Sequence, residues 1–399
     1  TIPGIKDRLS YLKASMKPGE ANKPRKVHTS GPYWSDNGKN ALISVRAADN
    51  KDRWLMLLDL ATGKPELLDR QRDTAWIGGP GISRSFRGED LGWLPDNKHI
   101  WYQSEESGYS HLYILNIKNK KEKALTSGEF EIYNPRISKN DKYWYFNANK
   151  THPGERHFYK MPLKGGKMEQ LTFREGRNDV TLSPDEKYMA IRHSASNEPW
   201  EIYLKKNKPK AESIQLTNSL TEEFKSYNWR KPEFITFEAD DGAMVHARLY
   251  KPQKPANSNK SAVIFVHGAG YKQNAHKWWS SYFREYMFHN FLVDQGYTVL
   301  DIDYRGSAGY GRDWRTAIYR HMGGKDLSDQ VDGAEYLINN HNINSDKIGI
   351  YGGSYGGFIT LMALFKEADT FAAGAALRSV TDWAHYNHSY TSNILNKPT

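Results

Sequence analysis

Cysteine is absent from the 399-residue sequence. Its absence excludes disulfide bonds, thiolate metal sites and a cysteine nucleophile. It leaves the cellular compartment open, because many bacterial periplasmic proteins also lack cysteine, and we favour a periplasmic or secreted location over a cytoplasmic one. Any run of about 18 apolar residues is missing too, so we expect no membrane span in this segment.

Blocks of like charge are also missing. The formal net charge is +10, but the lysines and arginines are scattered among acidic residues. Because no nucleic-acid-binding module is recognisable either, we expect no nucleic-acid partner. The sequence has neither an initiator methionine nor a signal peptide. It begins at Thr1 and stops at Thr399 as if cut from a longer protein.

The length and composition predict two folded domains, at roughly 100–200 residues per domain. Hydrophobic residues make up 38% of the chain, which is enough for a core in each domain. The many tyrosines and tryptophans favour β-rich structure. The rhythm of the sequence changes near Arg230, so we place one domain at residues 1–230 and the other at residues 231–399.

A repeat runs through residues 1–230. Polar turn segments recur, each just before a short apolar strand, and their marker lysines are Lys39, Lys98, Lys142 and Lys187. The intervals are 59, 44 and 45 residues, and the longer one suggests an insertion around residues 70–89. A period near 40–50 with four short strands per unit is typical of a β-propeller. We therefore predict a partial propeller, with a β-sandwich as the alternative.

From residue 231 on, apolar runs alternate with helical patterns. We expect strands over 234–237, 244–250, 262–266, 297–302 and 347–351, helices over 278–293, 327–340 and 355–365, and a further buried segment over 371–377. Such βαβ alternation indicates a doubly wound, mostly parallel sheet with helices on both faces.

The segment Gly352-Gly353-Ser354-Tyr355-Gly356-Gly357 lies between an expected strand and an expected helix. At such a junction, G-x-S-x-G is the nucleophile elbow of an α/β-hydrolase. Small neighbours let the strand and helix approach, and the helix N-terminus favours developing negative charge. We therefore predict that Ser354 is the nucleophile of an α/β-hydrolase domain of which only the N-terminal part is present.

Backbone N–H groups are expected to hold the oxyanion. One donor is the N–H of Tyr355, which follows the nucleophile. The second is the N–H of Ala269, in the loop His267–Gly270 after the strand over 262–266. We expect the His267 side chain to stabilise this loop. Acyl transfer by this route needs no metal or cofactor.

The acid and base of a catalytic triad are not identifiable. In α/β-hydrolases the order along the chain is Ser, then Asp or Glu, then His. Only 45 residues follow Ser354. The candidates among them are Asp369, Asp382, His385 and His388. These lie before the later strands whose loops hold the acid and base, so we assign none of them, and we interpret the upstream Asp301 and Asp303 as structural. Because serine without a base is a weak nucleophile, we expect this chain alone to be nearly inactive.

With these motifs in place, the sequence resembles the prolyl oligopeptidase family, and within it the dipeptidyl-peptidase IV-like branch. The resemblance covers nearly the whole chain. It rests on the elbow, on residues 303–311 (DYRGSAGYG) and on the blade sequence at 104–111 (SEESGYSH) followed by 125–128 (LTSG). It implies a serine peptidase acting on short peptides that the propeller filters. His267 stands where dipeptidyl-peptidase IV-like members have an oxyanion-binding Tyr, which is closer to the acylaminoacyl-peptidase branch.

The resemblance also implies a proline-accepting pocket after the elbow. Carried over residue by residue, its apolar lining is Tyr355, Val380, Trp383, Tyr386 and Tyr390. Such a slot suits a flat pyrrolidine ring, although ordinary core packing is an alternative for these aromatics. Arg87, with Phe86, resembles a substrate-contacting pair on the propeller rim. The family's paired-Glu motif is not recognisable, which leaves exopeptidase and endopeptidase specificity open.

Three classes of function therefore stand. The first is a serine peptidase that cleaves after proline or a small apolar residue through an acyl-enzyme on Ser354. The second is an esterase or amidase of the same fold, against which the aromatic slot argues. The third is an inert fragment that acts as a binding module, against which the intact elbow argues. A short peptide is the expected partner, and a homodimer is left open.

Overall fold

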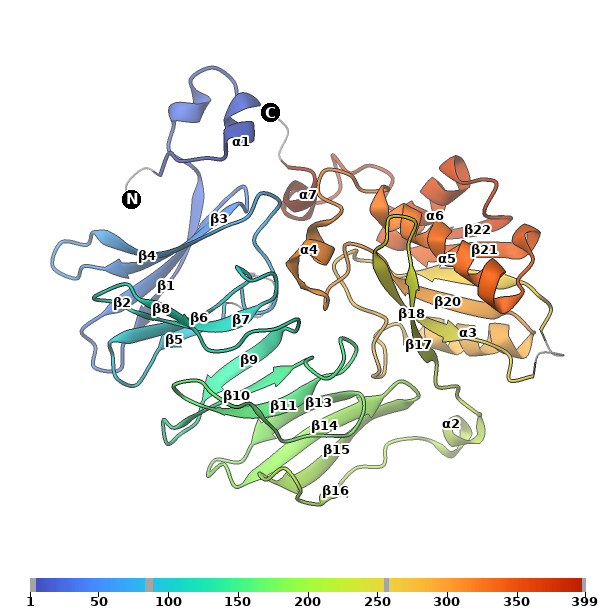
Figure 1. Cartoon of the computed structure of the whole chain (residues 1–399), viewed down its shortest axis with the longest axis horizontal. Coiled ribbons are helices and arrows are strands. Elements are labelled where there is room, and N and C mark those ends of the chain that lie inside the picture. Colours follow the sequence, from blue (N-terminus) through green and yellow to red (C-terminus); the bar gives the residue numbers. More distant parts are fainter. Residues whose placement is uncertain (1–4, 83–88, 255–257, 397–399) are drawn as a thin grey trace.

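The computed structural model describes residues 5–82, 89–254 and 258–396. Two parts of different architecture lie beside each other in Figure 1: small antiparallel sheets, coloured blue to green, and a mixed sheet flanked by helices, coloured yellow to red. Short helices precede the first sheet (α1, Ser10–Ala14, and a 3₁₀ turn at Glu20–Asn22), and α2 (Glu222–Ser226) lies between the two parts.

Four antiparallel sheets of four strands follow one another in the first part. The first two contain β1 (Val27–Trp34), β2 (Ala41–Ala47), β3 (Asp52–Leu58) and β4 (Pro65–Arg72), then β5 (Leu91–Trp93), β6 (His99–Ser104), β7 (His111–Asn116) and β8 (Glu122–Ala124). The next two contain β9 (Ile132–Ile137), β10 (Tyr143–Ala148), β11 (His157–Pro162) and β12 (Glu169–Gln170), then β13 (Arg177–Leu182), β14 (Tyr188–Ala195), β15 (Glu198–Lys206) and β16 (Ser213–Gln215). Each marker lysine lies in the turn before the second strand of its sheet, so the repeat is a blade and the predicted partial propeller is confirmed.

The apolar side chains of neighbouring blades pack against one another. Leu42 and Leu55 of the first blade share a core with Tyr102 of the second. In the same way, Tyr145 of the third blade packs in one core with Met189 of the fourth. A single four-stranded sheet cannot bury both of its faces, so neighbouring blades stabilise one another.

The longer interval between the first two marker lysines comes from the connection between β4 and β5. Trp76 in this connection is buried in the core of the second part, and its ring centroid lies 6.3 Å from that of Tyr319. This connection therefore packs against the second part at Trp76 and does not add a strand to a blade there.

The second part is a six-stranded sheet in the order β17-β18-β20-β19-β21-β22. Its strands are β17 (Glu233–Glu238), β18 (Met244–Tyr250), β19 (Ala262–Val266), β20 (Thr298–Asp303), β21 (Ile348–Gly353) and β22 (Ala373–Leu377). The last four are mutually parallel, whereas β17 and β18 pair antiparallel. The α/β-hydrolase prediction is therefore confirmed, with an antiparallel pair at one edge of the sheet.

Helices cover both faces of this sheet. The helices are α3 (Phe283–Asp294), α4 (Gly311–Thr316), α5 (Lys325–His341), α6 (Tyr355–Lys366) and α7 (His388–Ile394), with a 3₁₀ turn at Ser345–Lys347. Val299 packs with Val293 of α3, whereas its neighbour Leu300 packs with Leu337 of α5. Successive residues of one strand thus face different helices, as the pleat requires. Among the described residues, no helix is long and apolar enough to cross a membrane.

Helix α3 begins five residues later than the expected start at Trp278. The preceding residues contact the propeller instead: the Lys277 N–H donates to the Gly154 carbonyl (2.8 Å), and the Trp279 N–H donates to the Ser194 hydroxyl (3.2 Å). Because these N–H groups bond across to another domain, tertiary structure overrides local helical preference here.

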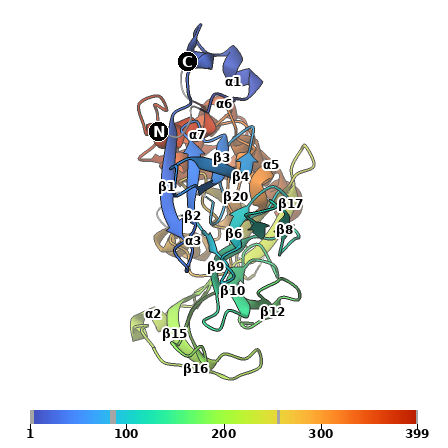
Figure 2. The same ribbon diagram turned by 90° about the vertical axis from the view of Figure 1, so that its left-hand side faces the viewer.

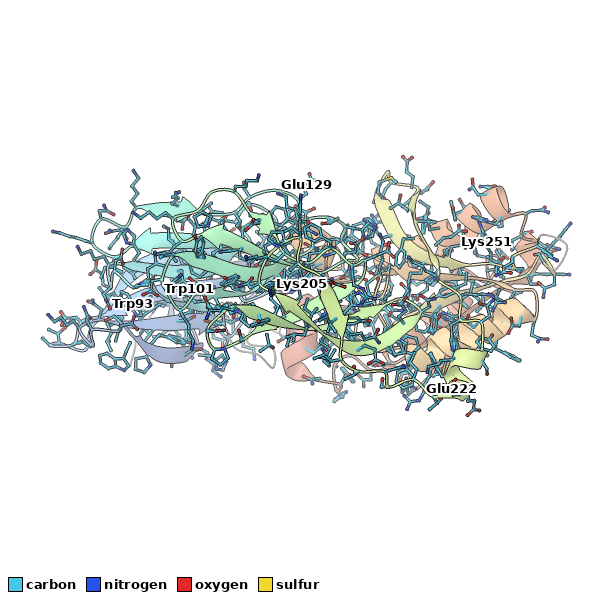
Figure 3. All side chains as sticks on the ribbon, turned by 90° about the horizontal axis from the view of Figure 1, so that it is seen from below. Trp93, Trp101, Glu129, Lys205, Glu222 and Lys251 are labelled. Atoms are coloured by element: carbon cyan, nitrogen blue, oxygen red, sulfur yellow. The ribbon has the colours of Figure 1, made fainter. Side chains whose placement is uncertain are left out.

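Further contacts between the two parts come from turns within the blades, on one side of the propeller. The Arg315 guanidinium of α4 donates to Glu105, which follows β6, at 2.6 Å, and the Asn149 side chain donates to the Gly309 carbonyl at 2.9 Å. Glu105 is buried, and burial raises its pKa to about 7. Figure 2 views the molecule from the propeller side, and Figure 3 shows the two parts side by side, with Trp93 and Trp101 in the propeller and Lys251 on the far side of the second part.

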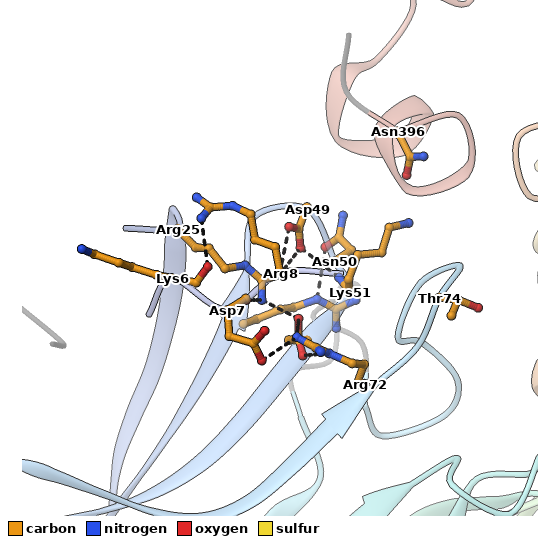
Figure 4. A network of polar contacts seen from close by, with 12 residues as sticks. Lys6, Asp7, Arg8, Arg25, Asp49, Asn50, Lys51, Arg72, Thr74 and Asn396 are labelled. Carbon is orange, nitrogen blue, oxygen red and sulfur yellow. Dashed lines mark hydrogen bonds and ion pairs between the residues drawn. The ribbon is translucent and has the colours of Figure 1, made fainter. Parts of the chain in front are cut away.

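The segment before β1 is fixed to the first blade by ion pairs (Figure 4). Arg25 donates to both oxygens of Asp49, at 2.7 and 2.9 Å, and to the buried Asp52. The Tyr11 hydroxyl of α1 lies 2.9 Å from the Tyr319 hydroxyl, which donates to Asn396 at 3.0 Å. The N-terminal segment therefore connects the first blade to the residues just after α7.

Candidate active site

Ser354 occupies a sharp turn at the carboxyl end of β21, immediately before α6. Its backbone has φ 58° and ψ −115°, a conformation that a residue with a side chain adopts only when its surroundings impose it. The Ser354 N–H donates to the Leu377 carbonyl of β22 (2.9 Å), which helps to hold the turn. The side chain is half-buried at the edge of the sheet.

The flanking glycines are required by close approach to β19. A methyl group on Gly356 would lie 2.0 Å from the Val266 carbonyl oxygen, and one on Gly352 would lie 2.5 Å from the same atom. Real side chains do not tolerate either distance. The elbow can therefore sit against the end of β19 only with glycine at both positions.

The expected oxyanion donors belong to the elbow itself and to the loop after β19. The Tyr355 N–H is the first of α6 and has no partner within the helix, as at any helix N-terminus. Ala269 has a positive φ of 46°, which places it in a tight turn of the loop after β19. Gly268 of this loop lies against the elbow: a methyl group there would lie 2.8 Å from the Gly353 carbonyl oxygen and 3.4 Å from the Ser354 Cβ. The loop and the elbow are therefore in close contact.

The His267 side chain lies beneath the loop and is fully buried. Its Nε2 is 3.0 Å from the Ser307 hydroxyl and its Nδ1 is 2.9 Å from the Gly268 carbonyl. Its ring also stacks on Tyr304, with centroids 4.4 Å apart. These contacts use both ring nitrogens for holding the loop.

The structure brings the sequence-predicted aromatics together beside Ser354. The ring centroids of Trp383 and Tyr355 are 5.5 Å apart, and Trp383 lies 5.6 and 6.0 Å from Tyr386 and Tyr390. Val380 is buried, and its N–H donates to the Ser354 carbonyl (3.4 Å). The rings meet at steep or tilted angles, as aromatic pairs prefer.

Two known protein families match the sequence of this chain. The family described as "Dipeptidyl peptidase IV (DPP IV) N-terminal region" matches residues 9–200, and the "Prolyl oligopeptidase family" matches residues 282–399. The chain belongs to the prolyl oligopeptidase family, in its dipeptidyl-peptidase IV-like branch. This confirms the resemblance inferred from the elbow and blade motifs.

Curated relatives include dipeptidyl peptidase 4 of Trichophyton equinum, which is 27% identical over 372 residues, 91% of this chain and 47% of that protein. Dipeptidyl peptidase 8 of Homo sapiens is 29% identical over 295 residues, 70% of this chain and 32% of that protein. The chain spans about half or less of the length of these relatives.

Solved structures share the fold across both parts of this chain. Porphyromonas gingivalis dipeptidyl peptidase 4 matches with a TM-score of 0.76 at 21% identity, over 96% of this chain and 52% of that one. A structure from Bacteroides ovatus ATCC 8483 matches with a TM-score of 0.78 at 23% identity, over 95% of this chain and 55% of that one.

Other site residues of this prolyl oligopeptidase family member lie as follows. Arg87 falls outside the described residues. Asp382 and His385 pair with each other (2.7 Å) on an exposed turn. Across residues 5–82, 89–254 and 258–396, no hydrogen bond joins the Ser354 hydroxyl to an imidazole. Asp301 is fully buried and pairs with Arg248, in keeping with a structural role.

Sequence reasoning missed three residues that contact the site. The Tyr355 hydroxyl donates to Asp326, which is fully buried at the start of α5 and fixes the Tyr355 ring. Tyr271 is half exposed, and its ring centroid lies 5.5 Å from that of Tyr390, so it adds a fifth ring to the aromatic cluster. The Tyr282 hydroxyl accepts the Gly268 N–H at 2.9 Å. The only sequence signal for Tyr271 is its position directly after the oxyanion loop.

Proposed function

We propose that Ser354 is the nucleophile of a serine peptidase that cleaves short peptides after proline or a small apolar residue. The observation that best supports this proposal is that Tyr355 contributes two groups beside Ser354. Its N–H lies directly after Ser354, and its ring forms a wall of the aromatic slot. An acyl group whose ring enters the slot therefore has its carbonyl beside both the nucleophile and an oxyanion donor.

In this reaction the Ser354 oxygen attacks the carbonyl carbon, and the carbonyl electron pair moves to oxygen. The N–H groups of Tyr355 and Ala269 stabilise that oxyanion. The serine proton passes to a general base and then to the leaving amine, which leaves an acyl-enzyme that water hydrolyses. We place the base and its orienting acid in a longer protein, since the relatives are about twice the length of this chain.

The position of the propeller supports the proposal that it limits the size of the substrates. Its blades pack directly against the domain that carries the elbow, so large substrates would have to pass it. We place the boundary between residues 1–230 and 231–399, in the connection between β16 and β17. The relatives are named dipeptidyl peptidases, so release of N-terminal dipeptides is the first activity to assay.

An organophosphonate probe tests the nucleophile. In the longer protein the probe should label Ser354, and Ser354→Ala should abolish labelling, whereas Ser345→Ala, in an exposed turn before β21, should not. Labelling that survives Ser354→Ala would refute the assignment. This 399-residue chain should turn over substrate far more slowly than the longer protein, and equal rates would show that the triad lies within residues 1–399.

A further inference from the structure

The Tyr282 hydroxyl lies at the oxyanion loop, although Tyr282 precedes α3 and is distant from Ser354 along the chain. It accepts the Gly268 N–H at 2.9 Å. A methyl group on Gly268 would lie 3.1 Å from this hydroxyl and 3.4 Å from the Ser354 Cβ. The Tyr282 hydroxyl and the Ser354 side chain therefore both lie close to Gly268.

Tyr282 is held rigidly in that place. Its ring meets Phe265 of β19 edge to face, with centroids 5.5 Å apart. Its N–H donates to the Ser280 hydroxyl (2.9 Å), which donates to Asn274 (2.6 Å), and Asn274 donates to the buried Asp301 at 2.8 and 3.0 Å. A group fixed by core packing and by a buried hydrogen-bond chain is preorganised, which is what oxyanion stabilisation requires.

The hydroxyl proton of Tyr282 is free to donate. Its oxygen is the acceptor in the bond with Gly268, and within the described residues the O–H has no acceptor of its own. Burial raises the pKa of Tyr282, so the phenol keeps its proton at neutral pH. The imidazole of His267, in contrast, is occupied with Ser307 and Gly268 below the loop.

We propose that the Tyr282 hydroxyl donates a hydrogen bond to the oxyanion formed on attack by Ser354, beside the N–H groups of Tyr355 and Ala269. This inference rests on the proposed serine peptidase function. Tyr282 keeps its proton throughout: the new bond joins the Ser354 oxygen to the carbonyl carbon, and the serine proton goes to the general base. When the intermediate collapses, the carbonyl re-forms and the hydrogen bond from Tyr282 weakens.

The test compares two phenylalanine variants in the longer, probe-reactive protein. Tyr282→Phe removes the proposed donor. Tyr286→Phe is the matched control, because Tyr286 lies one turn further along α3 and its hydroxyl donates to the Arg230 carbonyl (2.8 Å), away from the loop. Loss of one oxyanion donor lowers kcat by about 10²–10³-fold. We expect a fall of about 100-fold for Tyr282→Phe with KM unchanged, and a kcat close to wild type for Tyr286→Phe.

A transition-state analogue separates donation from a structural role. Affinity for a peptide boronate, which forms a tetrahedral anion on serine, should fall for Tyr282→Phe by the same factor as kcat/KM. Unchanged kcat, or a loss confined to KM with unchanged boronate affinity, would overturn the inference. If Ser354→Ala still reacted with the phosphonate, the proposed function would fail instead, so the two failures are distinguishable.

A fluorinated tyrosine at position 282 covers the case in which Tyr282→Phe unfolds. Fluorination makes the phenol more acidic with little change of shape. Because an ionised phenol cannot donate, the upper limb of the kcat–pH profile should move to lower pH. A limb at the wild-type position would show that Tyr282 does not donate to the oxyanion.

Discussion

Replacing Gly356 with alanine adds one methyl group where α6 meets the end of β19. At an ordinary helical position this change stabilises a protein by about 1 kcal/mol. Here the methyl carbon would lie 2.0 Å from the Val266 carbonyl oxygen and 3.1 Å from that of His267. The first distance is roughly 1 Å or more inside van der Waals contact, so the backbone must move. We expect the free energy of unfolding to fall by about 1–3 kcal/mol, as in overpacked cores.

The same shift moves the oxyanion loop relative to Ser354. A misplacement of about 1 Å at reacting groups can cost about 100-fold in rate. In the longer protein, we therefore expect phosphonate labelling of Ser354 to slow by about that factor in Gly356→Ala. The unfolding free energy is measured by urea titration and the labelling rate by mass spectrometry of the intact protein.

Gly349→Ala is the matched control in β21. Its methyl group would meet its nearest neighbours at 3.7 and 4.0 Å, which is ordinary contact. Stability should change by less than about 0.5 kcal/mol, and labelling should keep its rate. If Gly356→Ala were as stable and as reactive as Gly349→Ala, the close approach of α6 to β19 would be wrong, and close approach would not be the reason for glycine beside Ser354.

Further variants test the slot and the buried charges. Trp383→Ala should weaken selection for proline in a panel of peptide amides more than it slows hydrolysis of a small ester; unaltered selectivity would mean that these aromatics are core packing. Arg248→Met leaves Asp301 buried without its ion-pair partner and should lower the free energy of unfolding, measured by urea titration, by about 3–5 kcal/mol. Adding Asp301→Leu should recover part of this loss. If the effects of the two substitutions simply added, the two residues would not be coupled. Burial raises the pKa of Glu105 from 4.5 to about 7, so its folded form favours the proton, and stability should fall by up to about 3 kcal/mol as pH rises from 4.5 through 7. Glu105→Gln should flatten that fall, and an unchanged pH profile would assign it to other groups.

The blades and the elbow could be predicted because their signals are local. The turn before each second strand uses polar residues whose bonds lie within a few positions, such as Ser183 with Asp185 (2.7 Å). Ser354 was recognisable because a strand, a sharp turn and a helix follow one another without interruption. Such features depend little on what the rest of the chain does.

The contacts that join the two parts and that surround Ser354 could not be predicted, since they connect segments distant along the chain. Arg315 and Glu105 are 210 positions apart, and no sequence pattern around either residue indicates that they pair. Tyr282 was expected inside a helix, but the residues before it bond to the propeller and turn its phenol towards Gly268. Only the three-dimensional arrangement assigns such residues to a site.

Hydrogen bonds connect the hydroxyls of Tyr11 and Tyr319 and the side-chain amide of Asn396. Tyr11 and Tyr319 are 308 positions apart, and Asn396 follows α7, the helix that carries Tyr390 of the slot. The outer wall of the slot is thus braced against the first helix of the chain. Amino-acid changes in α1, which lies outside the proposed slot, therefore belong in any library of variants meant to alter the proposed selectivity.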